Sequence, residues 1–255
     1  MTRIIMQGCN GKMGQCITGL CKEDPEIMIV AGVDTYDGIK NDYPVFSDIK
    51  ACDVEADAVI DFSSPKATDD VIDYCLEKKI GLVLCTTGLS EEQIEKAKAA
   101  ADAIPVLRSA NMSLGINLLE KLLQDATKVL AAAGFDIEIV EKHHRLKKDA
   151  PSGTALALAD AVSKGLPEPY EYVFDRSDRS IQRPDKEIGI SAVRGGTIVG
   201  DHDVIYAGAD EVITFSHRAY SKAVFGKGAM EAAKFLNGKG AGLYTMSDLF
   251  ADPEN

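Results

Sequence analysis

The stretch that decides the fold is Arg3-Ile4-Ile5-Met6-Gln7-Gly8-Cys9-Asn10-Gly11-Lys12-Met13-Gly14. Its apolar half is suited to a buried strand, and it runs directly into a turn with three glycines and then a helix pattern at about 12–23. Glycines at such a turn allow a tight bend, and the amides at the start of the helix can face phosphate groups. The stretch therefore predicts the first strand, turn and helix of a parallel α/β sheet, with an anion site at the turn.

The glycine spacing alone is a weak indicator of a dinucleotide site. It is GxxGxxG rather than the more usual GxGxxG, and a glycine-rich turn that binds nothing is the alternative. Asp34 supports the dinucleotide, because it ends the second predicted strand, 20 residues after Gly14. A carboxylate at that place can accept hydrogen bonds from both hydroxyls of the adenine ribose.

The rest of the first domain repeats the same alternation of buried strand and amphipathic helix. Strands are predicted at 3–7, 27–33, 58–62, 81–85 and 105–108, and helices at about 12–23, 65–78 and 90–102. The loops 61–65 and 85–88 follow predicted strands, so they should reach the same crevice as the nucleotide, although each alone is more often an ordinary turn. The pattern predicts a Rossmann-type parallel sheet.

The pattern changes after a long apolar-faced helix at about 113–133. A strand at 136–141, a helix at 154–164, an irregular loop at 166–183 and strands at 187–193, 197–206 and 211–216 follow. We expect an α/β chain with a Rossmann-type domain at 1–113 and 222–255, to which the final helix and tail return. Residues 114–221 should form an α+β domain that binds substrate. Its sheet should be an open mixed or antiparallel one, whose edges another subunit covers.

Composition excludes several classes of partner. The chain has 255 residues and a formal charge of -12, which opposes attraction to nucleic acid or to an anionic membrane. No apolar run approaches the ~20 residues of a membrane span, and the start lacks signal-peptide features, so we expect a cytoplasmic protein. All six cysteines lie in the first third, without a CxxC pair or histidines at ligand spacing. They predict reduced thiols and no metal site.

The densest chemistry is Glu141-Lys142-His143-His144-Arg145-Leu146-Lys147-Lys148-Asp149-Ala150-Pro151-Ser152-Gly153-Thr154. A charged run usually marks a solvated face. This one ends at a predicted helix start, where free amides and hydroxyls can bind a carboxylate, and it contains two of the four histidines. Histidine suits proton transfer near neutral pH. The run is therefore the predicted catalytic and anion-binding segment.

The segment 141–155 resembles the signature of the dihydrodipicolinate reductase family. The similarity extends to Gly8–Gly14, the Asp-Phe-Ser-Ser-Pro loop at 61–65, Thr86-Thr87-Gly88, Ser109–Ser113 and the region 216–228, so it covers nearly the whole chain. The resemblance implies NADH- or NADPH-dependent reduction of 4-hydroxy-tetrahydrodipicolinate, a cyclic dicarboxylate, to tetrahydrodipicolinate in diaminopimelate and lysine biosynthesis. It also implies a homotetramer built through the second domain.

The resemblance also implies the site residues. His143 would donate the proton, Lys147 would assist in donation or substrate binding, and the substrate carboxylates would be held by His144, Ser152, Gly153 and Thr154. The predicted cofactor contacts are Gly8, Cys9, Asn10, Gly11, Lys12, Met13, Asp34, Phe62, Cys85, Thr86, Thr87, Ser109, Ala110, Asn111 and Met112. Many relatives have Gly-Thr-Thr-Gly where this chain has Cys85-Thr86-Thr87-Gly88.

Two questions stay open at the level of sequence. A nucleotide-sensing regulator and a reductase of open-chain aldehydes or 2-keto acids are the alternative functions. How proton donation is divided between His143 and Lys147 is also open. For His202 and His217 we expect ordinary structural roles. Asp34, followed by Thr35 rather than a basic residue, predicts that NADH is used at least as well as NADPH.

Overall fold

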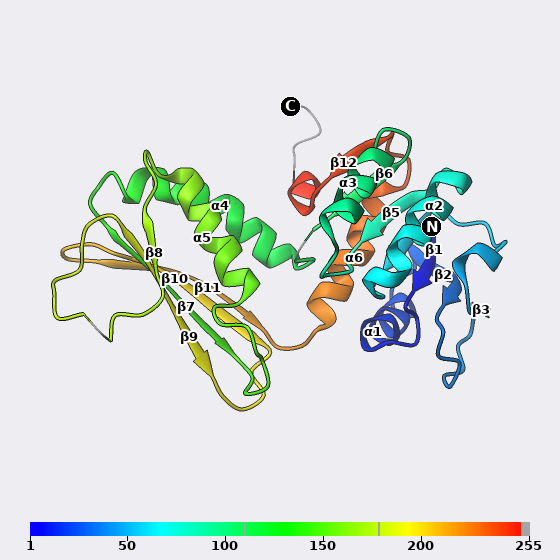
Figure 1. Cartoon of the computed structure of the whole chain (residues 1–255), viewed down its shortest axis with the longest axis horizontal. Coiled ribbons are helices and arrows are strands. Elements are labelled where there is room, and N and C mark those ends of the chain that lie inside the picture. Colours follow the sequence, from blue (N-terminus) through cyan, green and yellow to red (C-terminus); the bar gives the residue numbers. More distant parts are fainter. Residues whose placement is uncertain (110, 178, 251–255) are drawn as a thin grey trace. The chain divides into compact units, whose positions relative to one another are not determined.

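The computed structural model describes residues 1–109, 111–177 and 179–250. The chain divides into two compact units (Figure 1). The first unit comprises Met1–Leu114 and the chain from Lys222 onward, and the second comprises Gly115–Ser221. Among the described residues, no helix combines the length and apolar character needed to cross a membrane.

The first unit is built on a parallel sheet with the strand order β12-β6-β5-β4-β1-β2-β3. Its continuous apolar runs form strands buried on both faces, as the sequence predicted. The strands are β1 (Thr2–Gln7), β2 (Ile27–Val33), β3 (Val45–Phe46), β4 (Ala58–Asp61), β5 (Gly81–Leu84), β6 (Pro105–Arg108) and β12 (Gly242–Tyr244).

Helices cover both faces of this sheet. On one face α1 (Lys12–Cys21) and α6 (Ala223–Leu236) pack in one apolar cluster with Ile4 and Met6 of β1. On the other face α2 (Pro65–Lys78) and α3 (Glu91–Ala100) pack in a second cluster with Ile5. Alternate residues of β1 thus feed two separate cores, and the predicted Rossmann-type parallel sheet is confirmed.

The sequence missed four short elements of the first unit, two between β2 and β4 and two in the C-terminal tail. β3 has only two residues and pairs with β2, and a short 3-10 helix, η1 (Ile49–Ala51), follows it. Elements this short carry no readable periodicity. The tail returns to the sheet as expected, because β12 pairs with β6 and a second 3-10 helix, η2 (Met246–Phe250), follows it.

The second unit contains a five-stranded sheet with the order β11-β10-β7-β9-β8. β7 pairs parallel with β9 but antiparallel with β10, so the predicted mixed sheet is confirmed. In Figure 1, α4 (Leu114–Leu130) and α5 (Gly153–Gly165) lie on one side of it, and their apolar side chains share a core with the strands. The strands are β7 (Asp136–His143), β8 (Glu171–Val173), β9 (Glu187–Arg194), β10 (Gly200–Ala207) and β11 (Val212–Ala219).

The expectation that 166–183 is an irregular loop is wrong in part. Glu171–Val173 forms β8, which pairs parallel with β9 at the edge of the sheet. Three residues between prolines and charges give no alternation that a sequence pattern can reveal. The strand forms because its neighbour β9 supplies the hydrogen-bonding partners.

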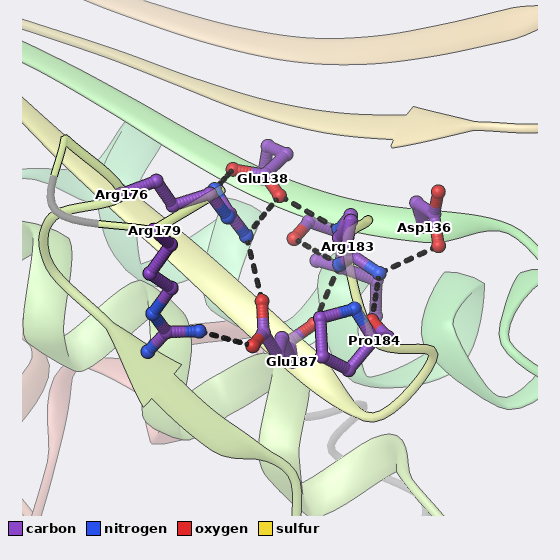
Figure 2. A network of polar contacts seen from close by, with 8 residues as sticks. Asp136, Glu138, Arg176, Arg179, Arg183, Pro184 and Glu187 are labelled. Carbon is purple, nitrogen blue, oxygen red and sulfur yellow. Dashed lines mark hydrogen bonds and ion pairs between the residues drawn. The ribbon is translucent and has the colours of Figure 1, made fainter. Parts of the chain in front are cut away.

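Ion pairs bind the segment after β8 back onto the sheet (Figure 2). Glu138 of β7 lies at the centre, where it accepts hydrogen bonds from both terminal nitrogens of Arg176 at 2.9 and 2.8 Å and from Nε of Arg183 at 3.0 Å. Arg183 also reaches Asp136 at 2.6 Å. Planar guanidinium groups suit such shared contacts with carboxylates.

A second carboxylate, Glu187, completes this network. Its side chain is only 3% exposed and it pairs with Arg176 at 3.1 Å and with Arg179 at 2.7 Å. Burial raises the pKa of Glu187, but the two guanidinium groups outweigh it and hold the pKa below its usual value. Three arginines from the chain after β8 thus pair with three carboxylates of β7 and β9.

Gly189 makes room for this network, and Gly189→Ala should disrupt it. A Cβ at Gly189 would lie 1.9 Å from Oε2 of Glu138 and 2.7 Å from a terminal nitrogen of Arg176. We expect thermal unfolding to show a loss of about 1–3 kcal/mol, the usual range for overpacking. Gly195→Ala is the matched control, because a Cβ there meets nothing within 4 Å. Equal stabilities of the two variants would contradict this account.

Candidate active site

The turn after β1 has a shape that only glycine can provide. Gly8 has φ +81°, and a Cβ there would lie 2.6 Å from the carbonyl oxygen of Phe62. A Cβ at Gly14 would lie 2.3 Å from the carbonyl oxygen of Gly8 and 2.5 Å from that of Cys9. The turn is therefore folded so tightly that the first turn of α1 lies against its own entry loop.

The start of α1 has the features of an anion site. Gly11 is the N-cap residue, and within the described part of the chain no side chain caps the helix. Its first-turn amides are therefore left for a ligand or solvent, and the helix dipole favours a negative group there. Lys12, at the first position of the helix, is exposed. These features fit the pyrophosphate of a dinucleotide.

Asp34 at the end of β2 lies directly beside this turn. Its two carboxylate oxygens accept hydrogen bonds from the backbone amides of Asn10 at 2.9 Å and Tyr36 at 3.0 Å. An ionised carboxylate has about four acceptor positions, so two remain for ribose hydroxyls. The Asn10 side chain is engaged elsewhere, with the carbonyl of Tyr36 and with Asn41. It therefore helps to fix the loop that follows β2.

A cavity of about 390 Å³ adjoins Asp34. Apolar side chains of Val33, Ile49 and Ala67 line part of it, and Lys66 near the start of α2 lines another part. The sequence did not single out this cavity, because its lining comes from β2, η1 and α2. Its size and mixed lining suit a flat heterocycle next to a ribose.

Asp61 links the two predicted loops at the ends of β4 and β5. The side chain is fully buried, and it accepts hydrogen bonds from the hydroxyl of Ser63 at 2.5 Å and from that of Thr86 at 2.9 Å. Burial raises the pKa of Asp61, although these hydrogen bonds act in the opposite direction. Phe62 and Thr86 are thus held close together, whereas the Cys85 side chain is buried in the core.

Of the predicted cofactor residues at 109–112, the structure describes Ser109, Asn111 and Met112. The Ser109 hydroxyl bonds to both the carbonyl and the amide of Asn111. The carbonyl of Met112 lies so close to α6 that a Cβ at Gly228 would come within 1.6 Å of it. Ala110 lies outside the described residues.

In the second unit, β7 places His143 on its buried face. Its burial alternates, so that Ile137, Ile139, Glu141 and His143 lie on the buried face. His144 follows directly after the strand, is partly exposed, and its Nδ1 has no hydrogen-bond partner among the described residues. The neighbouring histidines therefore occupy different surroundings.

Nδ1 of His143 lies 2.6 Å from the carboxylate of Glu141. That carboxylate is fully buried and also forms a two-point ion pair with Arg194, at 2.6 and 2.8 Å. Burial raises the pKa of Glu141, but the hydrogen bonds from Arg194, His143 and the Ser152 amide outweigh burial and lower it. Glu141 is therefore ionised at neutral pH.

His202 of β10 lies beside His143. The two rings meet edge to face with centroids 5.2 Å apart, and Nε2 of His202 is 3.2 Å from the Ser152 hydroxyl. Burial, and then the proximity of His143, lowers the pKa of His202 to about 4. His202 is accordingly neutral near pH 7, which leaves His143 as the better candidate for a proton donor.

The remaining predicted substrate residues lie around the start of α5. Ser152 is buried as its N-cap, and its hydroxyl accepts from the amide of Ala155 while its own amide donates to Glu141. Gly153 is exposed and Thr154 is half-buried. Lys147 pairs with Asp149 at 2.8 Å and keeps 21% of its side chain exposed.

Comparisons with known families show which family this chain belongs to. Residues 2–112 match the family described as "Dihydrodipicolinate reductase, N-terminus" and residues 115–250 match "Dihydrodipicolinate reductase, C-terminus". The chain belongs to the dihydrodipicolinate reductase family. It is thus an oxidoreductase with a Rossmann-type unit of the kind that binds a nicotinamide dinucleotide.

Curated relatives are similar to this chain over nearly its whole length. The "4-hydroxy-tetrahydrodipicolinate reductase" of Caldanaerobacter subterraneus subsp. tengcongensis is 57% identical over 98% of both chains. That of Clostridium tetani is 51% identical over 96% of both. A solved structure, "Dipicolinate bound Dihydrodipicolinate reductase from Paenisporosarcina sp. TG-14", has a TM-score of 0.79 at 22% identity and covers 96% of this chain and 97% of its own. That similarity shows the shared fold.

The sequence analysis missed four residues of the site. Asp61 stood in a quoted loop, and Glu141 stood two residues before His143, a spacing that places both on one face of a strand. Arg194 and His202 lie some 50 residues further along the chain. No local pattern could have linked them to His143, because strand pairing alone brings them together.

Proposed function

We propose that this protein reduces 4-hydroxy-tetrahydrodipicolinate to tetrahydrodipicolinate with NADH or NADPH, in the synthesis of diaminopimelate and lysine. The main support for the proposal is the contact between Nδ1 of His143 and the carboxylate of Glu141. It occurs in a chain whose two units match the N-terminal and C-terminal parts of this family. Relatives at 57% and 51% identity are named for this reaction.

The first unit would hold the cofactor. The amides at the start of α1, with Gly8, Cys9, Asn10, Gly11, Lys12 and Met13, would hold its pyrophosphate, and Asp34 would hold its adenine ribose. We place the adenine in the cavity beside Asp34. The nicotinamide half would meet Phe62, Cys85, Thr86 and Thr87 together with Ser109, Ala110, Asn111 and Met112. The bound nicotinamide supplies the hydride.

The second unit would hold the substrate and deliver the proton. Loss of water from the substrate, its 4-hydroxyl group leaving with a hydrogen of the neighbouring carbon, would give a conjugated ring. Addition of the hydride to that ring leaves electron density next to the carbon that receives it, so an acid must protonate it. His143 would donate that proton, with Lys147 as a partner in donation or binding. His144, Ser152, Gly153 and Thr154 would hold the ring carboxylates near the start of α5, where the helix dipole favours anions. Since the Ser152 hydroxyl is buried, Gly153 and Thr154 are better placed for direct contact.

We also propose the assembly and the compartment that the family resemblance implies. The protein would be a homotetramer built through the sheet of the second unit, and it would act in the cytoplasm on a small-molecule substrate. Its formal charge of -12 fits neither a nucleic-acid nor an anionic membrane partner. Among the described residues, no group of three or more His, Cys, Asp or Glu side chains is arranged to hold a metal ion.

NADH should be used at least as well as NADPH, and Asp34→Asn should reduce that advantage. Charge-assisted hydrogen bonds to the ribose contribute about 1.5–3 kcal/mol, and the same charge repels a 2′-phosphate. We expect the ratio of kcat/KM for NADPH to that for NADH to rise roughly tenfold or more in the variant. Asp37→Asn, an exposed carboxylate in the same loop, is the control. A wild-type enzyme that strongly prefers NADPH would contradict this interpretation of Asp34.

One coupled assay tests the proposed reaction. The purified protein would be mixed with NADH and with a substrate generated in place by the enzyme that forms 4-hydroxy-tetrahydrodipicolinate, and the loss of NADH absorbance would be followed. We expect turnover only when all components are present. Oxidation of NADH with open-chain 2-keto acids or aldehydes, and not with the cyclic dicarboxylate, would refute the proposal. Binding of NADH without turnover would favour a nucleotide-sensing regulator.

A further inference from the structure

The carboxylate of Glu141 is saturated by hydrogen-bond donors. Oε1 accepts from the amide of Ser152 at 3.0 Å and from Arg194 at 2.6 Å, while Oε2 accepts from Arg194 at 2.8 Å and from Nδ1 of His143 at 2.6 Å. These four donors match the four acceptor positions of a carboxylate. A group that is fully buried and fully bonded cannot also be a substrate ligand, so its role lies in what it holds.

Arg194 makes the buried charge of Glu141 tolerable. An isolated carboxylate in an apolar core is strongly unfavourable, and a two-point ion pair with a guanidinium group offsets much of that penalty. Arg194 also donates to the backbone carbonyl of Asp149 at 2.7 Å. The same side chain therefore fixes both Glu141 and the loop that leads to the start of α5.

This arrangement decides which nitrogen of His143 can exchange a proton. Because an ionised carboxylate only accepts, Nδ1 of His143 must carry the hydrogen that it shares with Glu141. The exchangeable proton is therefore on Nε2. That nitrogen lies beside Gly200 of β10, where a Cβ would come within 3.0 Å of it.

We propose that Glu141 and Arg194 are positioning residues that hold His143 in one orientation and one tautomer and balance the charge next to it, so that Nε2 can release its proton. The proposal rests on the proposed function only where it assigns the donor role to His143. The hydrogen-bond geometry stands without it.

The charge around His143 depends on the groups that face it from each neighbouring element. Glu141 of β7 stabilises the charged ring, and Arg194 of β9 opposes this effect because it cancels most of the carboxylate's charge. His202 of β10 is neutral, and Ser152 at the start of α5 contributes an uncharged hydroxyl. Beyond His202 lie Asp201 and His217, which act on His202 rather than touching His143. An acid of intermediate strength is the most effective proton donor near neutral pH.

Two substitutions should move the pH profile of turnover in opposite directions. Glu141→Gln removes the charge that stabilises protonated His143, so the basic limb of kcat should move to lower pH. Arg194→Gln removes the opposing charge, so the same limb should move to higher pH. Arg194→Lys keeps the charge and should restore the limb toward its wild-type position, even if the ion pair loses its two-point geometry.

Turnover at neutral pH should fall roughly 10- to 100-fold in Glu141→Gln, with little change in KM for the substrate. The matched control is Glu138→Gln on the same strand. Glu138 faces away from His143 and is also held by arginines, Arg176 and Arg183, so its loss perturbs β7 without touching the donor. We expect that variant to lose stability and to keep the wild-type pH profile.

Nitrogen-15 NMR of the histidine rings tests the positioning without any turnover. The chain has only four histidines, so single His→Gln variants suffice to assign them. We expect neutral His143 to carry its proton on Nδ1 in the wild type and largely on Nε2 in Glu141→Gln. An unchanged tautomer, or pH profiles that move in the same direction in the two charge variants, would overturn the inference. If the tautomer responds as expected but no cyclic dicarboxylate is reduced, the proposed function fails and the positioning stands.

Folding of each variant must be established by a separate signal. Affinity for NADH, which is proposed to bind in the other unit, serves for this purpose together with far-UV circular dichroism. If Arg194→Gln fails to fold, Glu141→Gln and Arg194→Lys still decide the question, because they predict different tautomers and different pH profiles.

Discussion

His143→Gln is expected to lower kcat by about 10²–10⁴-fold, the usual contribution of a general acid. Glutamine is close to histidine in size and can still hydrogen-bond to Glu141, but it cannot donate a proton at neutral pH. His143 is the suited donor because Glu141 fixes its ring, whereas the pKa of the adjacent His202 is lowered to about 4. Steady-state turnover and the dissociation constant of NADH, measured side by side, check the prediction, and NADH affinity should stay within about twofold.

His144→Ala is the companion variant. His144 lies just beyond β7, is partly exposed, and stands outside the network around Glu141, so its loss should mainly raise KM for the substrate. A different outcome would reassign the donor: if His143→Gln keeps near-normal turnover while Lys147→Ala abolishes it, the lysine donates the proton. Lys147 pairs with Asp149 in the structure and would have to leave that carboxylate to do so.

Gly14→Ala is expected to abolish cofactor binding at accessible NADH concentrations and to destabilise the first unit. The added Cβ would lie 2.3 and 2.5 Å from two backbone carbonyl oxygens, which cannot move aside as a flexible side chain can. Either α1 or the turn must shift, at a cost of about 3 kcal/mol in the free energy of unfolding. The pyrophosphate site, formed by that same turn, would be lost with it. Thermal unfolding and fluorescence titration with NADH measure the two effects.

Gly11→Ala separates packing within the turn from contact with the cofactor. Its Cβ would meet only the carbonyl of Gly8 at 3.3 Å, so the ligand-free protein should keep nearly its wild-type stability. It should still bind NADH more weakly, because a methyl group at the helix start hinders close approach of a phosphate. If Gly14→Ala and Gly11→Ala lose stability equally, the packing argument for Gly14 is wrong.

Strong periodicity made most elements of the fold predictable. The predicted strand 27–33 and helix 65–78 coincide with β2 and α2, because a continuous apolar run and a proline at the helix start leave little choice. β3 and β8 escaped prediction because strands of two and three residues form only when a neighbour offers an edge. The network of Arg176, Arg179 and Arg183 escaped for a related reason, since its carboxylate partners lie on other strands.

The parallel sheet, the glycine turn beside Asp34 and the histidine pair before the start of α5 could all be predicted from the sequence. Each depends on residues close together in the chain, whose spacing imposes a backbone shape or a shared face. The bridge that Glu141 forms between His143 and Arg194, and the position of His202 against them, become visible only once the strands are paired. Arg194 and His202 are brought in by the pairing of β9 and β10 with β7, over separations of 53 and about 60 residues. A buried carboxylate needs hydrogen-bonding or charged partners. The strand order of the sheet determines which distant cation lies close enough to pair with Glu141.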